Sequence, residues 1–162
     1  MTNDIEEREP DATEMEEQDA EAAPPLAGEI TSEEKVRIMA AAADSVRASD
    51  IVVLDLRDLT IITDFFLICT GNSSIQIRAI ADRIEEKLRE RGIRKSRIEG
   101  YQEATWILLD YGDVVAHVMA AEQRAFYNLE GFWANAPRLE LNLRPEMEIA
   151  VHTHPPGRFE AR

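Results

Sequence analysis

Residues 106–119 read Trp106-Ile-Leu-Leu-Asp-Tyr-Gly-Asp-Val-Val-Ala-His-Val-Met119, and this stretch decides the fold class of the chain. Two runs rich in β-branched and large apolar residues, 106–109 and 114–119, have the composition of strands. Between them stands Gly112, which can adopt the positive φ angle that a tight hairpin turn needs. The stretch therefore predicts two antiparallel strands that lie side by side.

Toward the N-terminus, two more apolar runs, 51–56 and 65–69, are short and β-branched enough to be buried strands. Residues 74–91 place apolar side chains at helical spacing, and Gly92 stands where a helix often ends on a glycine. A capping-box pattern at residues 31–34 opens an earlier helix with an apolar face through Ala48. Weaker patterns predict a short strand near 97–100 and a final helix from Glu122 to about Trp133.

This order of elements predicts a mixed β-sheet flanked by helices. The fold class is α/β, or α+β if the helices crowd onto one face of the sheet. The length of 162 residues and the 44% apolar content suit one compact domain with some chain to spare.

Negative charge is concentrated at the N-terminal end of the chain. The formal net charge is −14, and residues 1–30 contain eleven acidic side chains against one basic one. Such a segment has too few apolar groups to offset the entropy of ordering. We therefore expect a disordered acidic extension at 1–30. The His-Thr-His-Pro-Pro-Gly run at 152–157 predicts an irregular tail at 142–162, which leaves a folded domain at 31–141.

The same charge pattern bears on partners. Direct binding to nucleic acid normally needs clustered Lys and Arg side chains. The densest basic stretch, Arg89 to Arg97, is interrupted, and we interpret it as a solvated helix end and loop. A basic protein partner suits this chain better than nucleic acid. No run approaches the ~20 apolar residues of a membrane span, and the acidic N-terminus does not resemble a secretory signal. The single cysteine, Cys69, lies in an apolar run, so we expect its thiol to be buried. One cysteine cannot form an internal disulfide, which fits the reducing cytoplasm, and we expect a cytoplasmic protein.

An enzymatic interpretation has some support. Residues 70–74, Thr-Gly-Asn-Ser-Ser, end a strand before a helix, where free N–H groups could hold an anion as in nucleotidyltransferases. Those enzymes also need two or three carboxylates that converge on metal ions. Asp55 and Asp58 are three residues apart, and Asp110 and Asp113 flank a turn, so neither pair has the expected spacing. A plain helix cap is the favoured interpretation, and no catalytic residue and no cofactor are expected.

His152 and His154 have a spacing that could chelate a metal ion, but further ligands are missing from the same stretch. His117 alternates with Val115 and Met119 on a predicted strand and so shares their face. It is either a half-buried histidine bonded to a neighbour or a contact residue for a partner, and both interpretations stay open at this point.

Large aromatic residues gather in the C-terminal half of the chain: Trp106, Tyr127, Phe132 and Trp133. Trp and Tyr are favoured interface anchors, because they bury a large area at a small cost in side-chain entropy. Together with Arg124 on the final predicted helix, they predict a patch that binds another protein.

Several of these stretches together resemble the Iojap/RsfS family of ribosomal silencing factors. The matching motifs are Leu54-Asp-Leu56, the run from Ile62 to Ser74, Ile80-Ala-Asp82, Glu99-Gly100, the run from Trp106 to Val118, and Arg124-Ala-Phe-Tyr127-Asn-Leu-Glu130-Gly-Phe-Trp133. The resemblance covers about Glu34 to Trp133 in order and with compatible spacing. In one respect the chain departs from the family, since Gln76 stands where the family commonly has a histidine.

The resemblance implies a nucleotidyltransferase-like fold without the catalytic carboxylates. It also implies binding to the large ribosomal subunit through its ribosomal protein numbered fourteen, which sterically blocks association with the small subunit and represses translation. A role in large-subunit maturation without silencing is the alternative, and family members often form homodimers. On this likeness the expected partner-binding residues are Trp106, Leu108, Asp110, Asp113, Val115, His117, Arg124 and Tyr127.

Overall fold

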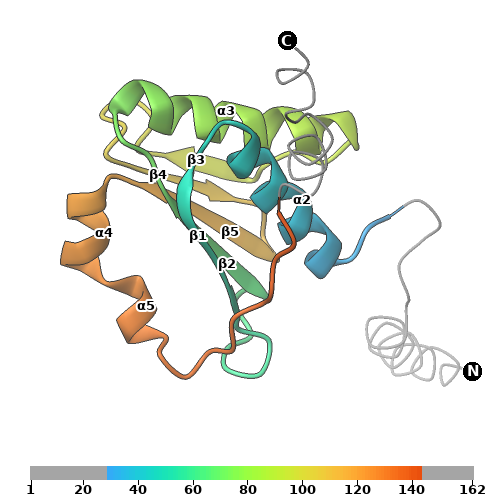
Figure 1. Ribbon diagram of the computed structural model, residues 1–162. Helices are drawn as coiled ribbons and strands as arrows, with labels where there is room; N and C mark the ends of the chain where they lie inside the picture. The colour runs from blue at the N-terminus through green and yellow to red at the C-terminus, as the bar shows by residue number, and fades with distance from the viewer. Residues whose placement is uncertain (1–28, 144–162) are drawn as a thin grey trace, which may run out of the picture. The chain divides into compact units, whose positions relative to one another are not determined.

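The computed structural model describes residues 29–143, which contain a five-stranded mixed sheet with the strand order β1-β2-β5-β4-β3 (Figure 1). The strands are β1 (Ser49–Asp55), β2 (Phe65–Thr70), β3 (Arg97–Glu99), β4 (Trp106–Asp110) and β5 (Val114–Met119). All neighbouring strands pair antiparallel except β2 and β5, which are parallel. The mixed sheet expected from the sequence is confirmed.

The helices are α2 (Ser32–Ser45), α3 (Ser74–Glu90), α4 (Ala121–Tyr127) and α5 (Leu129–Phe132). The two long helices, α2 and α3, cover one face of the sheet, and α4 and α5 lie on the other side (Figure 1). With both long helices on one face, the fold is the α+β form of the predicted class.

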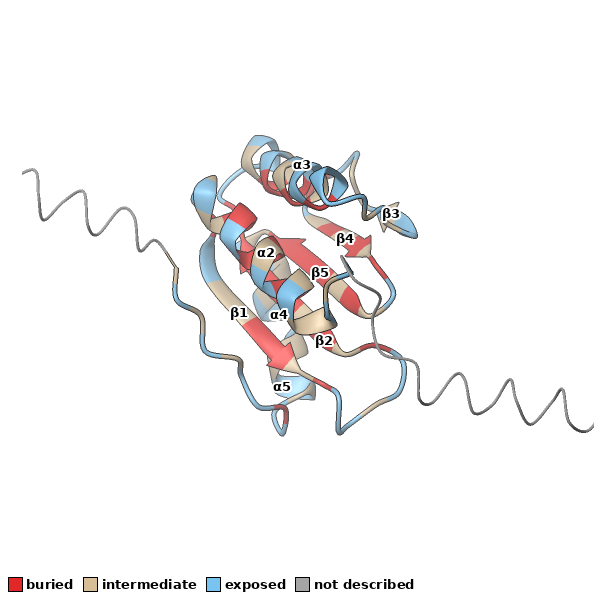
Figure 2. Ribbon diagram, turned by 90° about the vertical axis from the view of Figure 1, so that its right-hand side faces the viewer, coloured by how far each residue is buried: buried red, intermediate tan, exposed pale blue. Residues whose placement is uncertain are grey.

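The main core lies between the sheet and the two long helices. Strand residues that face α2 and α3 are fully buried, among them Phe65, Leu67 and Ile107. They meet an apolar helix face that includes Met39 and Ile84, and Figure 2 shows these inward faces as buried. The apolar side chains that recur every 3.6 residues in the helices therefore pack against those that recur every 2 residues in the strands, and together they form one core layer.

The hairpin forms as the sequence predicts. Leu108 of β4 lies opposite His117 of β5, and the Tyr111 N–H donates to the Val114 carbonyl over 2.9 Å. Gly112 has φ +84° at the turn. The Asp110 side chain stabilises the turn by accepting a hydrogen bond from the Gly112 N–H over 2.8 Å.

The helix α3 is capped at its start by its own side chains. Ser73 is the N-cap, and its hydroxyl accepts a hydrogen bond from the Gln76 N–H over 3.1 Å. The Gln76 side chain accepts from the Asn72 N–H over 2.6 Å and donates to the carbonyls of Val46 and Arg47 over 3.2 and 3.0 Å. Gln76 thus ties the start of α3 to the loop between α2 and β1.

The prediction of one continuous final helix from Glu122 to Trp133 is wrong, because the chain forms α4 and α5 with a break at Asn128. Asn128 adopts a left-handed conformation (φ 49°, ψ 55°), and its side chain accepts a hydrogen bond from the Gly131 N–H over 3.1 Å to cap α5. Asparagine tolerates this conformation better than most residues, and it is a preferred N-cap. Apolar residues continue at helical spacing on both sides of Asn128, so the sequence pattern does not indicate the break.

Past α5, residues 137–139 run along the open edge of β1. The Asp55 N–H donates to the Pro137 carbonyl over 2.8 Å, and the Leu139 N–H donates to the Val53 carbonyl over 2.9 Å. This segment covers a sheet edge that would otherwise offer unpaired backbone groups.

Two other expectations concern the core and the ends of the chain. Cys69 is fully buried as expected, and burial raises the pKa of its thiol to about 12. No helix within residues 29–143 is both long and apolar enough to cross a membrane. The predicted disordered extension, the irregular tail and the pair His152 and His154 lie wholly or almost wholly outside the described residues, so they stay predictions.

Candidate partner-binding surface

Five of the eight expected contact residues share one face of the sheet. Trp106, Leu108 and Asp110 alternate along β4 with the buried Ile107 and Leu109, which face the long helices. On β5 the same alternation places Val115 and His117 beside them, on the face that α4 and α5 cover in part. The hairpin register therefore brings these five side chains together, as a strand period of 2 requires.

Aromatic rings cross this face in an unbroken series. We call it the aromatic row, and its members in order of contact are Phe132, Trp133, Phe66, His117, Trp106, Tyr127 and Phe126. Neighbouring ring centroids are 4.5–6.2 Å apart, within the range of favourable aromatic pairs. His117 in the middle of the row is buried, Phe66, Trp106 and Trp133 are partly buried, and both ends of the row are exposed.

The exposed ends of the aromatic row present apolar area to solvent. Phe126 is 78% exposed, Phe132 is 77% exposed and Tyr127 is 50% exposed. Tyr127 packs against the partly buried Trp106 with a centroid distance of 4.8 Å and an interplanar angle of 48°, so this exposed ring has an aromatic support. Rigid exposed aromatics on a packed base are the usual anchors of a protein interface.

His117 lies in the buried middle of the row and is only 3% exposed. The Trp106 indole N–H donates to its Nδ1 over 3.1 Å, which leaves the ring proton on Nε2. Burial lowers the pKa of His117 to about 4, so the ring is neutral at pH 7. The bond fits the interpretation of a histidine held by a neighbour, with the ring more deeply buried than expected, and it fixes the orientation of the Trp106 indole.

Arg124 is engaged inside the protein. Its side chain is 12% exposed and donates to both carboxylate oxygens of Glu130 over 3.0 and 2.9 Å. It also donates to the Asp50 carbonyl over 2.7 Å and to the Thr70 hydroxyl over 2.9 Å. The guanidinium thus joins α4 and α5 to the ends of β1 and β2, and it lowers the pKa of Glu130.

Asp113 lies apart from the rest of the expected set. It follows the hairpin turn and pairs with Lys35 of α2 over 2.8 Å. The structure therefore brings Asp113 next to α2 and away from the aromatic row.

Sequence reasoning missed three residues of this surface: Phe66, Phe126 and Glu130. Phe66 lies in an apolar run, and no local sequence pattern distinguishes it from a residue of the main core. Glu130 is six residues from Arg124 across a helix break, a spacing that no helical rule connects. Phe126 could have been found, because a large aromatic beside Tyr127 on a short helix is hard to bury on both sides.

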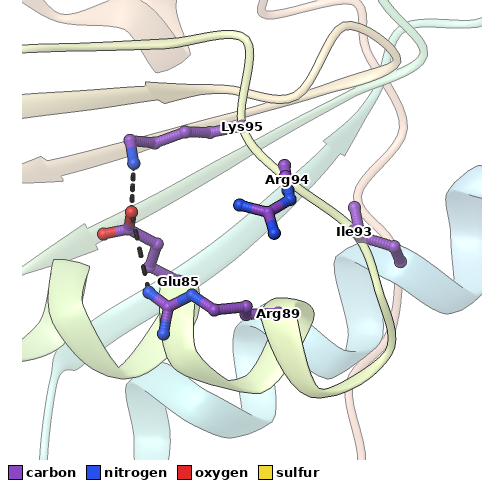
Figure 3. A pocket seen from close by; sticks show the side chains of 5 residues that line it. All are labelled: Glu85, Arg89, Ile93, Arg94 and Lys95. Atoms are coloured by element: carbon purple, nitrogen blue, oxygen red, sulfur yellow. Dashed lines mark hydrogen bonds and ion pairs between the residues drawn. The ribbon is translucent and has the colours of Figure 1, made fainter.

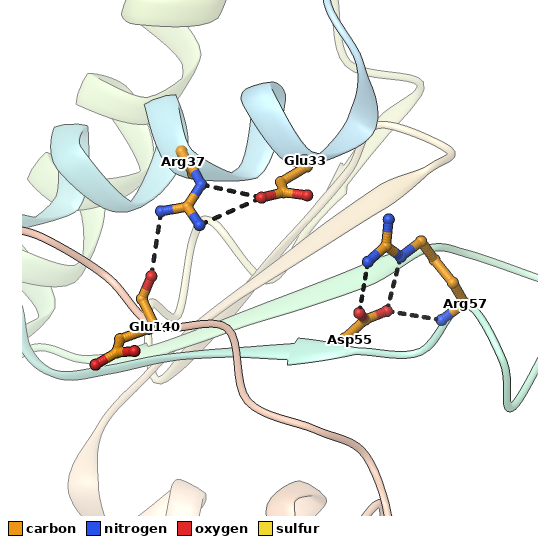
Figure 4. Close-up of polar contacts among 5 residues, drawn as sticks. All are labelled: Glu33, Arg37, Asp55, Arg57 and Glu140. Carbon is orange, nitrogen blue, oxygen red and sulfur yellow. Dashed lines mark hydrogen bonds and ion pairs between the residues drawn. The ribbon is translucent and has the colours of Figure 1, made fainter.

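The residues considered for an enzymatic role make structural contacts within the fold. The carboxylate of Asp55 is held by Arg57 over 2.7 and 2.9 Å, an interaction that lowers the pKa of Asp55 (Figure 4). The same view shows Arg37 of α2 bound to Glu33 and to the Glu140 carbonyl. Gly71 allows α3 to approach, because a Cβ there would lie 2.7 Å from Ile77 Cγ1. Within residues 29–143 no three His, Cys, Asp or Glu side chains are grouped so that they could hold a metal ion.

Comparisons with known proteins all point to one family. The family described as "Ribosomal silencing factor during starvation", RsfS, matches residues 29–160. The match leaves out most of the acidic N-terminal stretch, and it extends beyond Trp133, where the motif resemblance ended.

Individual relatives agree with this match. The ribosomal silencing factor RsfS of Bacillus subtilis is 46% identical over 66% of this chain and 91% of that protein. The RsfS of Halalkalibacterium halodurans is 43% identical over 69% of this chain and 96% of that protein. The chloroplastic protein Iojap of Zea mays is 43% identical over 64% of this chain and 45% of that longer protein.

Solved structures support the fold. A crystal structure of a protein from Chromobacterium violaceum has a TM-score of 0.64 at 32% identity, covering 65% of this chain and 88% of that one. One from Bacillus halodurans has a TM-score of 0.61 at 42% identity, covering 67% and 99%. Fold, motifs and relatives agree, and the chain belongs to the RsfS family of ribosomal silencing factors.

Proposed function

We propose that this protein binds the large ribosomal subunit through its ribosomal protein numbered fourteen and sterically blocks association with the small subunit. It acts in the cytoplasm as a binding protein without catalytic activity and so represses translation. The observation that carries the proposal is the aromatic row, whose exposed ends form a ready apolar surface in a chain of a silencing-factor family.

The row suits binding because it is already ordered. Phe126 and Phe132 have most of their surface in water, and Tyr127 has half. The Arg124–Glu130 pair fixes the two short helices that carry them. A surface that needs no rearrangement loses less entropy on binding, which raises affinity.

Charge supports a basic partner. Asp110 lies on the same sheet face, its side chain is 25% exposed, and its carboxylate is 3.4 Å from the Arg97 guanidinium. Glu122 is exposed in the first turn of α4. Ribosomal proteins are usually basic, so acidic groups around an apolar centre steer the approach of such a partner.

The test is sucrose-gradient sedimentation of purified subunits with the full chain and with a Phe126→Ala/Phe132→Ala variant. We expect the protein to migrate with large subunits and to deplete joined ribosomes. The variant should lose at least about tenfold in affinity, because exposed aromatic anchors carry most of the energy of an interface.

An Ile61→Ala/Ile62→Ala variant is the matched control. These two residues are 101% and 82% exposed in the loop between β1 and β2, so the control removes similar apolar surface elsewhere. Equal loss in both variants would contradict a specific role of the aromatic row.

The same gradients separate the alternatives. Binding to large subunits without an effect on subunit joining would favour a maturation factor. Binding to neither subunit would overturn the proposal and reopen a nucleotide-binding function at residues 70–74.

We also propose that the chain forms a homodimer, as the family resemblance implies. Light scattering on the full chain and on the Phe126→Ala/Phe132→Ala variant measures its mass in solution. A dimer that is absent only in the variant would show that self-association and partner binding use the same surface. A monomer at all concentrations would contradict the homodimer.

A further inference from the structure

Positive charge is concentrated where α3 ends. Residues 87–97 contain six of the 18 basic residues in the chain and one acidic residue, although the whole chain has a net charge of −14. The six are Lys87, Arg89, Arg91, Arg94, Lys95 and Arg97. Most of that negative charge lies in residues 1–30, and residues 31–162 contain 17 basic and 21 acidic side chains, so the surplus at 87–97 is a local feature of the folded part.

Part of this surplus lines a cavity of about 150 Å³. Its walls are Glu85 and Arg89 of α3 with Ile93, Arg94 and Lys95 of the following loop. Figure 3 shows Arg89, Arg94 and Lys95 around the space beside Glu85. Three cationic side chains therefore meet at one site.

The site holds more positive than negative charge. Lys95 forms an ion pair with Glu85, and Arg89 approaches the same carboxylate at 3.8 Å. Arg94 has no ion pair and no side-chain hydrogen bond among the residues that the structure describes. One carboxylate cannot neutralise three cations, so the site favours a further anion.

The cations are not needed to cap the helix. The Gly92 N–H donates to the Arg89 carbonyl and the Ile93 N–H donates to the Leu88 carbonyl, both over 2.9 Å. These two bonds form a Schellman motif, which satisfies the last carbonyls by backbone alone. The basic side chains of the loop are therefore left for other interactions.

The loop is also fixed in place. Ile93 packs against the core, and the Ser96 N–H donates to the Asp110 carbonyl over 2.7 Å. Arg94 and Lys95 lie between these two attachments, so their backbone is held at the cavity. A fixed backbone reduces the entropy lost when a ligand binds.

We propose that this cavity is a phosphate-binding site, with Arg89, Arg94 and Lys95 as ligands and Glu85 as the internal anion that the phosphate displaces. Guanidinium groups match phosphate oxygens with two parallel hydrogen bonds, and Lys adds a point charge.

The site goes beyond the proposed function and does not use its surface. Helix α3 covers one face of the sheet, and the aromatic row crosses the other. The phosphate comes either from the backbone of RNA or from a free polyphosphate. Both are the same chemistry, and the experiment distinguishes them.

The test uses the full chain with two probes: a fluorescent single-stranded RNA followed by anisotropy, and tripolyphosphate followed by calorimetry. The Arg94→Gln/Lys95→Gln variant should bind about tenfold more weakly. For RNA it should also reduce the slope of log affinity against log salt, by roughly 0.7 for each phosphate that the variant no longer neutralises. The matched control is Arg83→Gln/Lys87→Gln, which removes the same charge from α3 outside the residues that line the cavity and should change affinity less than about twofold.

A Glu85→Gln variant gives a result of opposite sign. Loss of the internal anion should strengthen phosphate binding several-fold, whereas a residue that only holds the loop in place would weaken it. Binding of RNA alone identifies a nucleic-acid backbone as the source, and binding of tripolyphosphate alone identifies a free polyphosphate.

The proposal is overturned if neither probe binds, if both charge-removing variants lose affinity equally, or if Glu85→Gln weakens binding. The Phe126→Ala/Phe132→Ala variant should bind both probes like the unmodified chain. Failure of the phosphate site is therefore distinguishable from failure of the proposed ribosome-binding surface.

Discussion

His117 sits between Phe66 and Trp106, and its chemistry follows from burial. In water its ring would be half protonated near pH 6.5, but the fold lowers its pKa to about 4. The ring therefore stays neutral, and its Nδ1 accepts the Trp106 indole N–H. Of the two interpretations of His117 that the sequence left open, this bond fits the histidine held by a neighbour.

Acid should destabilise the protein through His117. Its folded pKa lies below the unfolded value, so the unfolded chain binds the extra proton between about pH 6.5 and 4. The stabilisation is complete above pH 6.5 and is lost as the pH falls. Between pH 7.5 and 5 we expect a loss of about 2 kcal/mol in the free energy of unfolding, measured with urea.

A His117→Gln variant is the control, because glutamine can still accept from Trp106 but does not titrate. Its stability should change much less over the same pH range. An equal loss in both proteins would show that other groups cause the acid sensitivity.

Gln76 shows a second effect at the residue scale. Its amide group bonds Asn72 at the start of α3 and two carbonyls in the loop after α2. An amide supplies the one acceptor and the two donors that these partners need. Gln76 therefore has a structural role in this chain, since it ties the start of α3 to the loop after α2.

We expect Gln76→Ala to reduce the free energy of unfolding by about 1–3 kcal/mol, since three backbone groups lose their partner. Ile75→Ala is the comparison on the same helical turn, where the side chain is 76% exposed, and it should stay within about 0.5 kcal/mol. Chemical denaturation of both variants measures the difference. Similar values would mean that water replaces the Gln76 bonds without loss.

The helices α4 and α5 differ from α2 and α3 in how they are held. Neither short helix contains a buried residue, so little apolar area fixes them to the sheet. Their attachment instead uses the Arg124 bonds to Glu130, Asp50 and Thr70, together with the rings of the aromatic row. The surface that we propose for partner binding thus depends on one polar cluster.

Breaking that cluster should free the two helices. Glu130→Gln keeps the shape but removes the charge that neutralises Arg124, and we expect a loss of about 2 kcal/mol in stability. Hydrogen exchange should increase in residues 121–133 before it increases in α2 or α3. The double variant Arg124→Gln/Glu130→Gln should lose less than the sum of the two single variants. Additive losses would show that the two side chains act independently.

Across the whole molecule, the two faces of the sheet have different tasks. The face under α2 and α3 holds the large continuous core, and the opposite face carries a smaller cluster around Leu54, Ile68 and Met119. The smaller cluster leaves room for partly exposed aromatics. One face therefore holds most of the core, while the other is the face on which we propose that a partner binds.

The acidic extension is tested by a deletion at this scale. Removing residues 2–28 takes away ten acidic residues and one basic residue, and the family match begins only at residue 29. We expect the thermal unfolding midpoint to stay unchanged. Affinity for large subunits should rise at low salt, because repulsion from ribosomal phosphates is lost, and this gain should vanish at high salt. A lower unfolding midpoint would show that the extension contributes to the fold.

Local sequence patterns predict most elements of the fold, apart from the break at Asn128, and they identify the family. Local signals suffice for a hairpin around Gly112, for the Ser73 cap and for buried strands, because each depends on residues that are near in the chain. The same short-range patterns carried the family motifs. They also placed Trp106, Leu108, Val115 and His117 on one face, since strand alternation fixes that relation once the hairpin register is set.

Only the tertiary structure decided which of those side chains are exposed and what each one bonds. The pairing of Arg124 with Glu130, the break at Asn128 and the burial of His117 all depend on how α4 and α5 pack against the sheet. The cavity at Glu85 likewise needs a helix and a loop to meet. Contacts between residues distant in sequence are selected by the free energy of the whole fold, and no local pattern records that selection.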